Sequence, residues 1–273
     1  ASDADVMYVH DPLPGADPAA AAATAEAIVR EMRRLLETPA ADPPLLLDAD
    51  LRPEGKSGPV VRTLDSYAAY YRRWSATWES QALLRAAPIA GDMELGARFA
   101  SIIDPIRYPR GGVDDTALRE IRTLKARMEA ERLPRGADPL LHTKLGRGGL
   151  SDVEWVAQSL QLRYAHAVPA LRTTGTLQAL DAAVSHGLLD SDDGATLEVA
   201  WRLAARVRGV IMLVRGRAGD SLPTGTRDLA ALAGAMGYRD DDDGEGASVQ
   251  LLQDYRQATR RARTVMEKAF YGA

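Results

Sequence analysis

Carboxylates near the start of this 273-residue chain are the side chains best suited to carry chemistry. Asp3 and Asp5 are separated by one residue and precede the apolar run 6–9, which predicts a strand. Side chains alternate along a strand, so both carboxylates are expected on one face. Asp48 follows a second apolar run, residues 45–47. Three carboxylates on neighbouring strand ends would hold two divalent cations, which clamp a nucleoside triphosphate and the hydroxyl that attacks it.

An Asp-x-Asp pair alone is a weak signal, because acidic residues are common at strand ends as solvated turn formers. We expect only about one isolated pair in ten to bind metal, given how often short motifs occur by chance. The sequence that begins at Asp48 raises these odds, since residues 48–59 read DADLRPEGKSGP.

Four motifs in this chain resemble, in the same order, those of the glutamine synthetase adenylyltransferases. They are DADLRPEGKSGP at 48–59, TWESQALLRA at 77–86, KLGRGGLSDVEW at 144–155 and RTVMEKAFYG at 263–272. The resemblance covers nearly the whole chain. The second motif and Asp152 are more similar to the C-terminal half of that family, which attaches AMP to a tyrosine of glutamine synthetase. The N-terminal half removes this AMP by phosphorolysis.

The resemblance implies an α+β fold in two domains. Residues 1–91 would form a DNA polymerase beta-like nucleotidyltransferase domain, a mixed sheet with helices, and residues 92–273 an all-α helical bundle. In this superfamily a glycine loop ahead of the first carboxylate cradles the triphosphate. The sequence begins at Ala1 and reaches the carboxylates at once, so we expect a fragment that lacks this loop and the strand before it.

The resemblance also implies a two-metal transfer of AMP from ATP. Asp3 and Asp5 would bridge two Mg²⁺ ions, and Asp48 would ligate the ion nearest the nucleophile and is a candidate proton acceptor. Ser2, which precedes Asp3, is placed with the nucleotide-binding groups.

Two basic residues on the turn after Asp48, Arg52 and Lys56, are candidates to neutralise the triphosphate or the pyrophosphate. An alternative for Arg52, bracing the turn by pairing with Glu54 or Asp50, fits the sequence equally well. Asp50 itself is either a spare carboxylate beside the metals or a salt-bridge partner, and the second role is slightly favoured.

The third motif allows two interpretations. Ser151 and Glu154 have the Ser-x-x-Glu spacing of a capping box ahead of Trp155, and this structural role is favoured. The glycines within 146–149 would instead let a phosphate approach the backbone at a helix N-terminus. Asp152 is a further candidate site residue.

Helical periodicity predicts the elements that position these groups. Residues 19–36 predict a crossover helix between strands, with Ile28, Met32 and Leu35 on one stripe. Asp65 is expected to cap a second helix whose aromatic side chains we assign to the core rather than to a base-stacking platform: Tyr67, Tyr70, Tyr71, Trp74 and Trp78. Further helices are expected at 93–103 (ending before Pro105), 114–132, 150–167, 176–186, 195–217, 226–236 and 248–270.

Composition narrows the class of protein. A net charge of −4 argues against a general nucleic-acid binder. The chain has no Cys, which excludes disulfides and Cys-ligated zinc and fits a cytoplasmic protein. No apolar run approaches the roughly 20 residues that span a membrane.

The resemblance implies two partners, glutamine synthetase as the protein substrate and a small nitrogen-signal regulatory protein. Two alternatives to AMP transfer stay open. One is phosphorolytic removal of AMP by the same fold, and the other is a non-catalytic fragment that docks glutamine synthetase through residues 92–273.

Overall fold

The structure, a computed structural model, describes residues 4–38, 45–240 and 246–272. The chain divides into two compact units, Ala1–Arg110 (unit 1) and Gly111–Ala273 (unit 2). The expected boundary after residue 91 lies before helix α4 (Met93–Arg107), whereas the observed division lies after it. The reason is that Phe99 and Ile103 of α4 are buried in the hydrophobic core of unit 1.

Unit 1 contains four short strands, which pair in parallel. β1 (Ala4–Asp5) pairs with β3 (Leu47–Asp48), and β2 (Tyr8–His10) pairs with β4 (Val61–Thr63). β1 and β2 are successive parts of one extended segment, separated by two residues, as the apolar run predicts. β4 is a strand that the sequence analysis did not identify. The parallel pairing places the carboxyl ends of β1 and β3 at the same edge.

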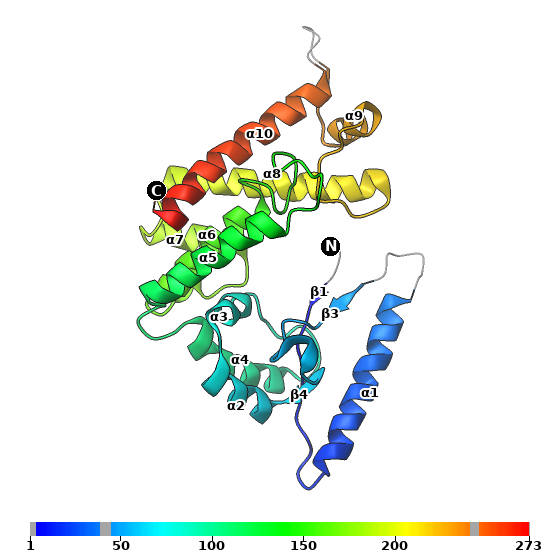
Figure 1. The fold of residues 1–273 in the computed structure, drawn as a ribbon, viewed down its shortest axis with the longest axis vertical. Coiled ribbons are helices and arrows are strands. Elements are labelled where there is room, and N and C mark those ends of the chain that lie inside the picture. Colours follow the sequence, from blue (N-terminus) through cyan, green and yellow to red (C-terminus); the bar gives the residue numbers. More distant parts are fainter. Residues whose placement is uncertain (1–3, 39–44, 241–245, 273) are drawn as a thin grey trace. The chain divides into compact units, whose positions relative to one another are not determined.

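Helix α1 (Pro18–Glu37) connects β2 to β3, close to the expected range. Its start is set by Asp17, whose carboxylate accepts the Ala20 N–H at 2.9 Å, and by Pro18 in the first turn. α1 contacts β2 and β4 from one side, whereas the later helices of unit 1 lie on the other side of the strands (Figure 1). The β2–β4 pair therefore has helices on both faces, as parallel sheets usually do.

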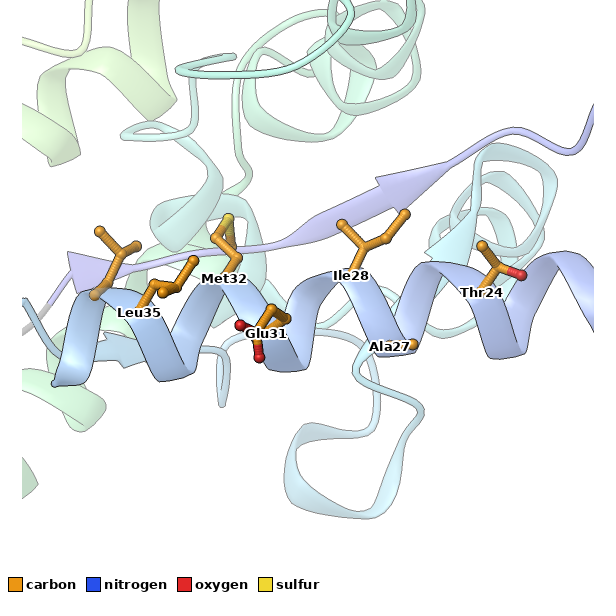
Figure 2. A pocket seen from close by; sticks show the side chains of 7 residues that line it. Thr24, Ala27, Ile28, Glu31, Met32 and Leu35 are labelled. Carbon is orange, nitrogen blue, oxygen red and sulfur yellow. The ribbon is translucent and has the colours of Figure 1, made fainter.

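The apolar stripe of α1 does not face the core. Ile28 is 64% exposed and Leu35 is 61% exposed, and no residue of α1 is buried. With Met32 they line an open surface pocket along the helix (Figure 2). The expected crossover helix is present, but Ile28 and Leu35 of its stripe are exposed, whereas Val29 and Met32 are half-buried.

The core of unit 1 is built by α2 (Leu64–Trp74), α3 (Thr77–Leu83) and α4. Tyr67 and Tyr71 are buried, as expected, and the Tyr67 ring meets Phe99 edge-on with a centroid distance of 5.0 Å. Trp74 and Trp78 are 61% and 41% exposed, so the assignment of all five aromatic side chains to the core is wrong for these two.

Two expected helix ends are also wrong. α2 is capped by Thr63, whose hydroxyl accepts the Ser66 N–H at 3.1 Å, whereas Asp65 lies inside the first turn. α4 continues through Pro105 to Arg107, because a proline in the last turn removes only one helical hydrogen bond. The continuation lets Arg107 donate to the Ala86 carbonyl at 2.7 Å, which links α4 to the end of α3.

The regular elements described in unit 2 are helical, in the order and approximate ranges expected. They are α5 (Asp115–Glu131), α6 (Leu150–Tyr164), α7 (Thr176–Ser185), α8 (Ser191–Arg215), α9 (Thr226–Ala235) and α10 (Ala247–Met266), with short 3₁₀ and π segments at Pro169–Leu171 and Glu267–Tyr271. α6 is central, with eleven of its 15 residues buried. Within the described ranges, no helix is both long and apolar enough to cross a membrane.

Candidate functional site

Two of the three predicted carboxylates lie side by side in unit 1. Asp5 and Asp48 are register partners on the parallel strands β1 and β3. Register partners on adjacent strands project to the same face of a sheet, with strands about 4.8 Å apart. Asp5 is exposed and Asp48 is half-buried, so both carboxylates are accessible from solvent. Ser2 and Asp3 lie outside the described residues.

The strand that carries Asp5 is fixed by the core beneath it. Met7 and Val9 pack against the aromatic cluster of α2 and α4. The Tyr67 hydroxyl donates to the Tyr8 carbonyl oxygen at 3.3 Å. Burial raises the pKa of Tyr67 to about 12, so its hydroxyl stays protonated and remains a donor at neutral pH. The aromatic side chains thus hold the strand rather than a ligand.

Asp48 is oriented by the turn that follows it. Its Oδ1 accepts the backbone N–H of Asp50 at 2.7 Å, the geometry of an Asx turn. Ala49 beside it is 5% exposed, so the backbone at this point has little freedom to move. The hydrogen bond from Asp50 therefore engages Oδ1 of Asp48 and fixes the orientation of the carboxylate, which determines where Oδ2 lies.

Arg52 braces this turn from inside. It is 7% exposed, and its guanidinium donates to the Ala49 carbonyl at 2.8 Å and twice to the Gly58 carbonyl at 3.0 and 3.1 Å. Its distance to the Asp50 carboxylate is 3.6 Å. Of the two roles open from the sequence, these contacts favour the brace over phosphate binding, with Asp50 rather than Glu54 as the acidic neighbour.

The other residues of the RPEGKSG segment have structural roles in the turn, through an ion pair and through close packing. Glu54 pairs with the buried Arg62 of β4, a residue that no sequence signal had marked. A Cβ on Gly58 would overlap the Pro53 carbonyl oxygen, and Gly55 has φ +54°. Close packing therefore requires Gly58, whereas Gly55 suits the left-handed backbone conformation.

Lys56 is the cation of this turn that faces solvent. Its side chain is 84% exposed, and its Nζ lies 3.2 Å from Oδ2 of Asp50. Asp50 is thus a salt-bridge partner, the role slightly favoured from the sequence. A lysine ammonium has three N–H donors, so Lys56 could contact a phosphate while it keeps its contact with Asp50.

The residues present fit divalent cations of the magnesium type. Such cations prefer carboxylate oxygens and keep several waters, so they bind where two or three carboxylates meet at an accessible edge. Asp5 and Asp48 form such an edge, with Asp3 preceding them in the sequence. Among the described residues no group of three or more His, Cys, Asp or Glu side chains gathers at one point.

The glycine loop of unit 2 has a different construction. Each backbone N–H from Gly146 to Asp152 donates to an oxygen of the protein, including Gly148 N–H to Asp152 Oδ2 at 2.7 Å and Leu150 N–H to the Thr143 carbonyl at 2.9 Å. A phosphate would have to displace these bonds. The loop therefore offers no ready anion site, in contrast to the second interpretation of its sequence.

The capping box expected from Ser151 and Glu154 is also absent from α6. The helix is capped by Gly149 without a side-chain hydrogen bond, and the buried Ser151 donates its backbone N–H to the Lys144 carbonyl at 3.0 Å. This expectation is wrong because the preceding loop itself satisfies the first N–H groups of the helix.

Asp152 is the centre of a buried ion network. It is 1% exposed and contacts Lys125 of α5 at 2.5 Å and Arg263 of α10 at 3.1 Å. Glu129 also contacts both cations, at 3.0 and 2.8 Å. Asp152 thus joins α5, α6, α10 and the glycine loop, which is a structural role that the sequence did not resolve.

Known proteins are similar to this chain in both of its units. Residues 1–102 match the family model of glutamate-ammonia ligase adenylyltransferase. Bifunctional glutamine synthetase adenylyltransferase/adenylyl-removing enzymes are similar to the whole chain: that of Streptomyces avermitilis is 64% identical over 272 residues, which is 100% of this chain and 27% of that protein. The chain belongs to this enzyme family.

Other members of the glutamine synthetase adenylyltransferase family are also similar to nearly the whole chain. The enzyme of Streptomyces coelicolor is 60% identical over 99% of this chain, and that of Mycobacterium avium is 54% identical over 98%. Each is covered over 26% of its own length, so the chain spans about a quarter of these relatives. Residues 122–270 also match a family model described as GlnD PII-uridylyltransferase, so the helical unit resembles a second nucleotidyltransferase family.

Proposed function

We propose that this chain carries the site that transfers AMP from ATP to a tyrosine of glutamine synthetase and releases pyrophosphate. Unit 1 would have the DNA polymerase beta-like nucleotidyltransferase fold, and unit 2 would be a helical bundle. The observation that carries the proposal is the register pairing of Asp5 with Asp48 at one accessible sheet edge. The names of the relatives support the substrate.

Asp5 and Asp48, with Asp3, would hold two Mg²⁺ ions. Bound there, these ions would neutralise the triphosphate and lower the pKa of an attacking hydroxyl, which is about 10 for a free tyrosine. Asp48 is fixed by the Asp50 N–H, so one carboxylate keeps a constant direction. Ser2 would contribute to nucleotide binding beside Asp3.

The bond changes define what the side chains must do. The tyrosine oxygen bonds to the α-phosphorus, the bond from that phosphorus to the β-phosphate oxygen breaks, and pyrophosphate leaves with the electron pair. The tyrosine proton passes to a base, for which Asp48 is the candidate. Because little covalent chemistry falls to the protein, positioning and charge would carry most of the rate.

The two basic residues of the turn would have separate tasks. Lys56 would meet the phosphate tail, since it is exposed and, within the part of the chain that the structure describes, its one ion pair is with Asp50. Arg52 would keep its three backbone contacts and hold the turn in shape. Binding of the nucleotide would then depend on Lys56 for charge and on Arg52 for geometry.

Removal of AMP is the second candidate, because the relatives are named for both activities. The same carboxylates would then act while inorganic phosphate attacks the AMP–tyrosine linkage, giving ADP and free tyrosine. A small nitrogen-signal protein is the proposed regulator of either direction, and the proposed location is the cytoplasm.

Incorporation of labelled AMP from ATP and magnesium into unmodified glutamine synthetase tests the transfer. The chain would be compared with a version extended upstream as in its relatives. We expect Asp5→Asn to lower the rate by about a hundredfold or more while the circular dichroism spectrum stays unchanged. Asp11→Asn, which removes an exposed ion pair with Arg98 in the same unit, is the matched control.

Residual activity of Asp5→Asn within about tenfold of the wild type would contradict the proposed site. No incorporation by either version, with glutamine synthetase verified as a substrate, would instead favour AMP removal. That reaction is recognised by its product, ADP formed from phosphate and adenylylated glutamine synthetase.

A further inference from the structure

A chain of two contacts links the carboxylate edge of unit 1 to the exposed cation of the turn. Asp50 donates its backbone N–H to Asp48 Oδ1 at 2.7 Å, and its carboxylate lies 3.2 Å from the Lys56 ammonium. The same residue therefore contacts a proposed metal ligand through its backbone and a proposed phosphate-binding cation through its side chain.

The position of Asp50 is fixed by the turn around it. Arg52 is bonded to the Ala49 and Gly58 carbonyls on either side, and its guanidinium lies 3.6 Å from Asp50. Gly58 is packed so closely that no Cβ fits. The backbone of Asp50 is thus held by the turn, whereas Lys56 has a long side chain that is 84% exposed.

The Asp50–Lys56 pair adds little to stability, because an exposed ion pair contributes only about 0–1 kcal/mol. Its effect on the lysine is larger. A free lysine side chain has about 2 kcal/mol of rotamer entropy to lose when it binds a phosphate. A carboxylate that already restricts the ammonium lowers this cost at the moment of binding.

We propose that Asp50 is a positioning residue that holds the Lys56 ammonium beside the Asp5–Asp48 edge, where it meets the phosphate tail of the nucleotide and the departing pyrophosphate. Asp50 itself is not a metal ligand, since its carboxylate is neutralised by Lys56 and lies near Arg52. This inference rests on the proposed function, because it assigns a partner to the same site.

Binding of magnesium pyrophosphate, measured by calorimetry, tests the inference without turnover. The protein is a full-length one that carries this sequence, as wild type, Asp50→Asn, Lys56→Met and the double variant. We expect Lys56→Met to raise the dissociation constant about tenfold, the effect of one charged hydrogen bond. Asp50→Asn should raise it about three- to tenfold, and the double variant should match Lys56→Met within about twofold.

Three further readouts separate positioning from other roles. Asp50→Asn should raise KM for ATP while kcat changes less than about twofold, since only binding is affected. Its affinity for Mn²⁺, followed by paramagnetic resonance, should equal that of the wild type. Asp50→Glu should recover most of the lost affinity, and Asp11→Asn, at the exposed pair with Arg98, should change nothing.

Several outcomes would overturn the inference. Effects of Asp50→Asn and Lys56→Met that multiply would show independent roles, and a weaker affinity for Mn²⁺ would make Asp50 a metal ligand. Unchanged pyrophosphate binding in Asp50→Asn would show that the Asp50–Lys56 contact is only a surface ion pair.

The two proposals can also fail separately. If Asp5→Asn still transfers AMP, but Asp50→Asn weakens pyrophosphate binding as expected, only the proposed function fails. If the wild type transfers AMP without binding pyrophosphate, this inference fails alone, and with neither transfer nor binding both fail.

Discussion

Two segments of this chain, RPEGKSG at 52–58 and GRGG at 146–149, both combine glycines with basic residues but differ in what they expose. In unit 1 the turn buries one cation, Arg52, and leaves a second, Lys56, in solvent beside two accessible carboxylates. In unit 2 the carboxylate that the loop contacts, Asp152, is 1% exposed and surrounded by its counter-ions.

The two segments are built from the same residue types but differ in whether their polar groups are already satisfied within the protein. Backbone N–H groups at 146–152 already have acceptors, and the charges near them are neutralised inside the protein. The carboxylate edge of unit 1 keeps its charge at the surface, where a cation can reach it. Glycine and charge alone therefore do not distinguish the two segments, whereas the exposure of the charged side chains does.

Replacing one aspartate in each unit should give opposite results. Asp152→Ala removes the partner of buried Lys125 and the acceptor of the Gly148 N–H, so we expect a loss of about 3–5 kcal/mol in unit 2. Asp48→Ala removes a half-exposed carboxylate and one hydrogen bond, a loss of about 1 kcal/mol, but should abolish AMP transfer. Native-state hydrogen exchange would measure both free energies of opening.

If Asp152→Ala lowered the free energy of unfolding of unit 2 by less than about 1 kcal/mol, the contrast between the two units would be contradicted. The buried network would then contribute no more than an exposed ion pair. Asp152→Asn is a useful companion variant. It keeps an acceptor for Gly148 and removes only the charge, so its loss of stability should lie between those of the wild type and Asp152→Ala.

Glycine replacements should rank in the same way, with smaller effects. Gly148 has φ +71°, and a Cβ there would overlap the Thr259 carbonyl oxygen of α10, so Gly148→Ala should destabilise unit 2 by about 2–4 kcal/mol. Gly55 has φ +54°, but the nearest atom to its Cβ would be the Asp50 oxygen at 3.6 Å. Gly55→Ala should therefore cost about 1 kcal/mol, as measured by urea unfolding.

A cost for Gly55→Ala as large as that for Gly148→Ala would contradict this ranking, since it would mean that backbone conformation dominates over packing. An equal and small cost at both positions would show that the 146–149 loop can move away from α10.

Much of the helical order was predictable from the sequence, since caps, prolines and periodicity are local signals. The expected helix at 114–132, for example, corresponds to α5, which Asp114 caps by accepting the Ala117 N–H. Two local signals, Asp65 and Pro105, misplaced a helix end, and other errors arose where the outcome depends on distant contacts. The stripe of Ile28 and Leu35 has the right period for a buried face, yet periodicity does not show which face meets the strands.

The residue types of the candidate site were predictable from the sequence, but the separate roles of its residues were not. The spacing of Asp5 and Asp48 on two strands indicated a shared edge, and the register agrees. No pattern in the sequence distinguishes the buried Arg52 from the exposed Lys56, because burial here depends on the Ala49 and Gly58 carbonyls. Arg62 and Lys125 were missed because single basic residues in a strand or helix give no signal.

Acid should loosen the loop of unit 2 before the turn of unit 1. Burial lowers the pKa of His142, against the opposing effect of Asp220, and Arg208 and Lys144 lower it further. The neutral ring is needed because Nδ1 accepts the Leu145 N–H at 3.0 Å. Since the pKa is lower in the folded state, the unfolded chain binds more protons, and stability falls as the pH drops below about 6.5.

Hydrogen exchange of the backbone at 142–149, compared at pH 7.5 and 5.5 after correction for the intrinsic rate, would measure this effect. His142→Asn offers a neutral acceptor at both pH values, so its protection should change less with pH than that of the wild type. The turn 49–58 contains no histidine and serves as the internal reference. Equal loss of protection in the wild type and in His142→Asn would assign the acid sensitivity to other groups and remove His142 from the bracing of the loop.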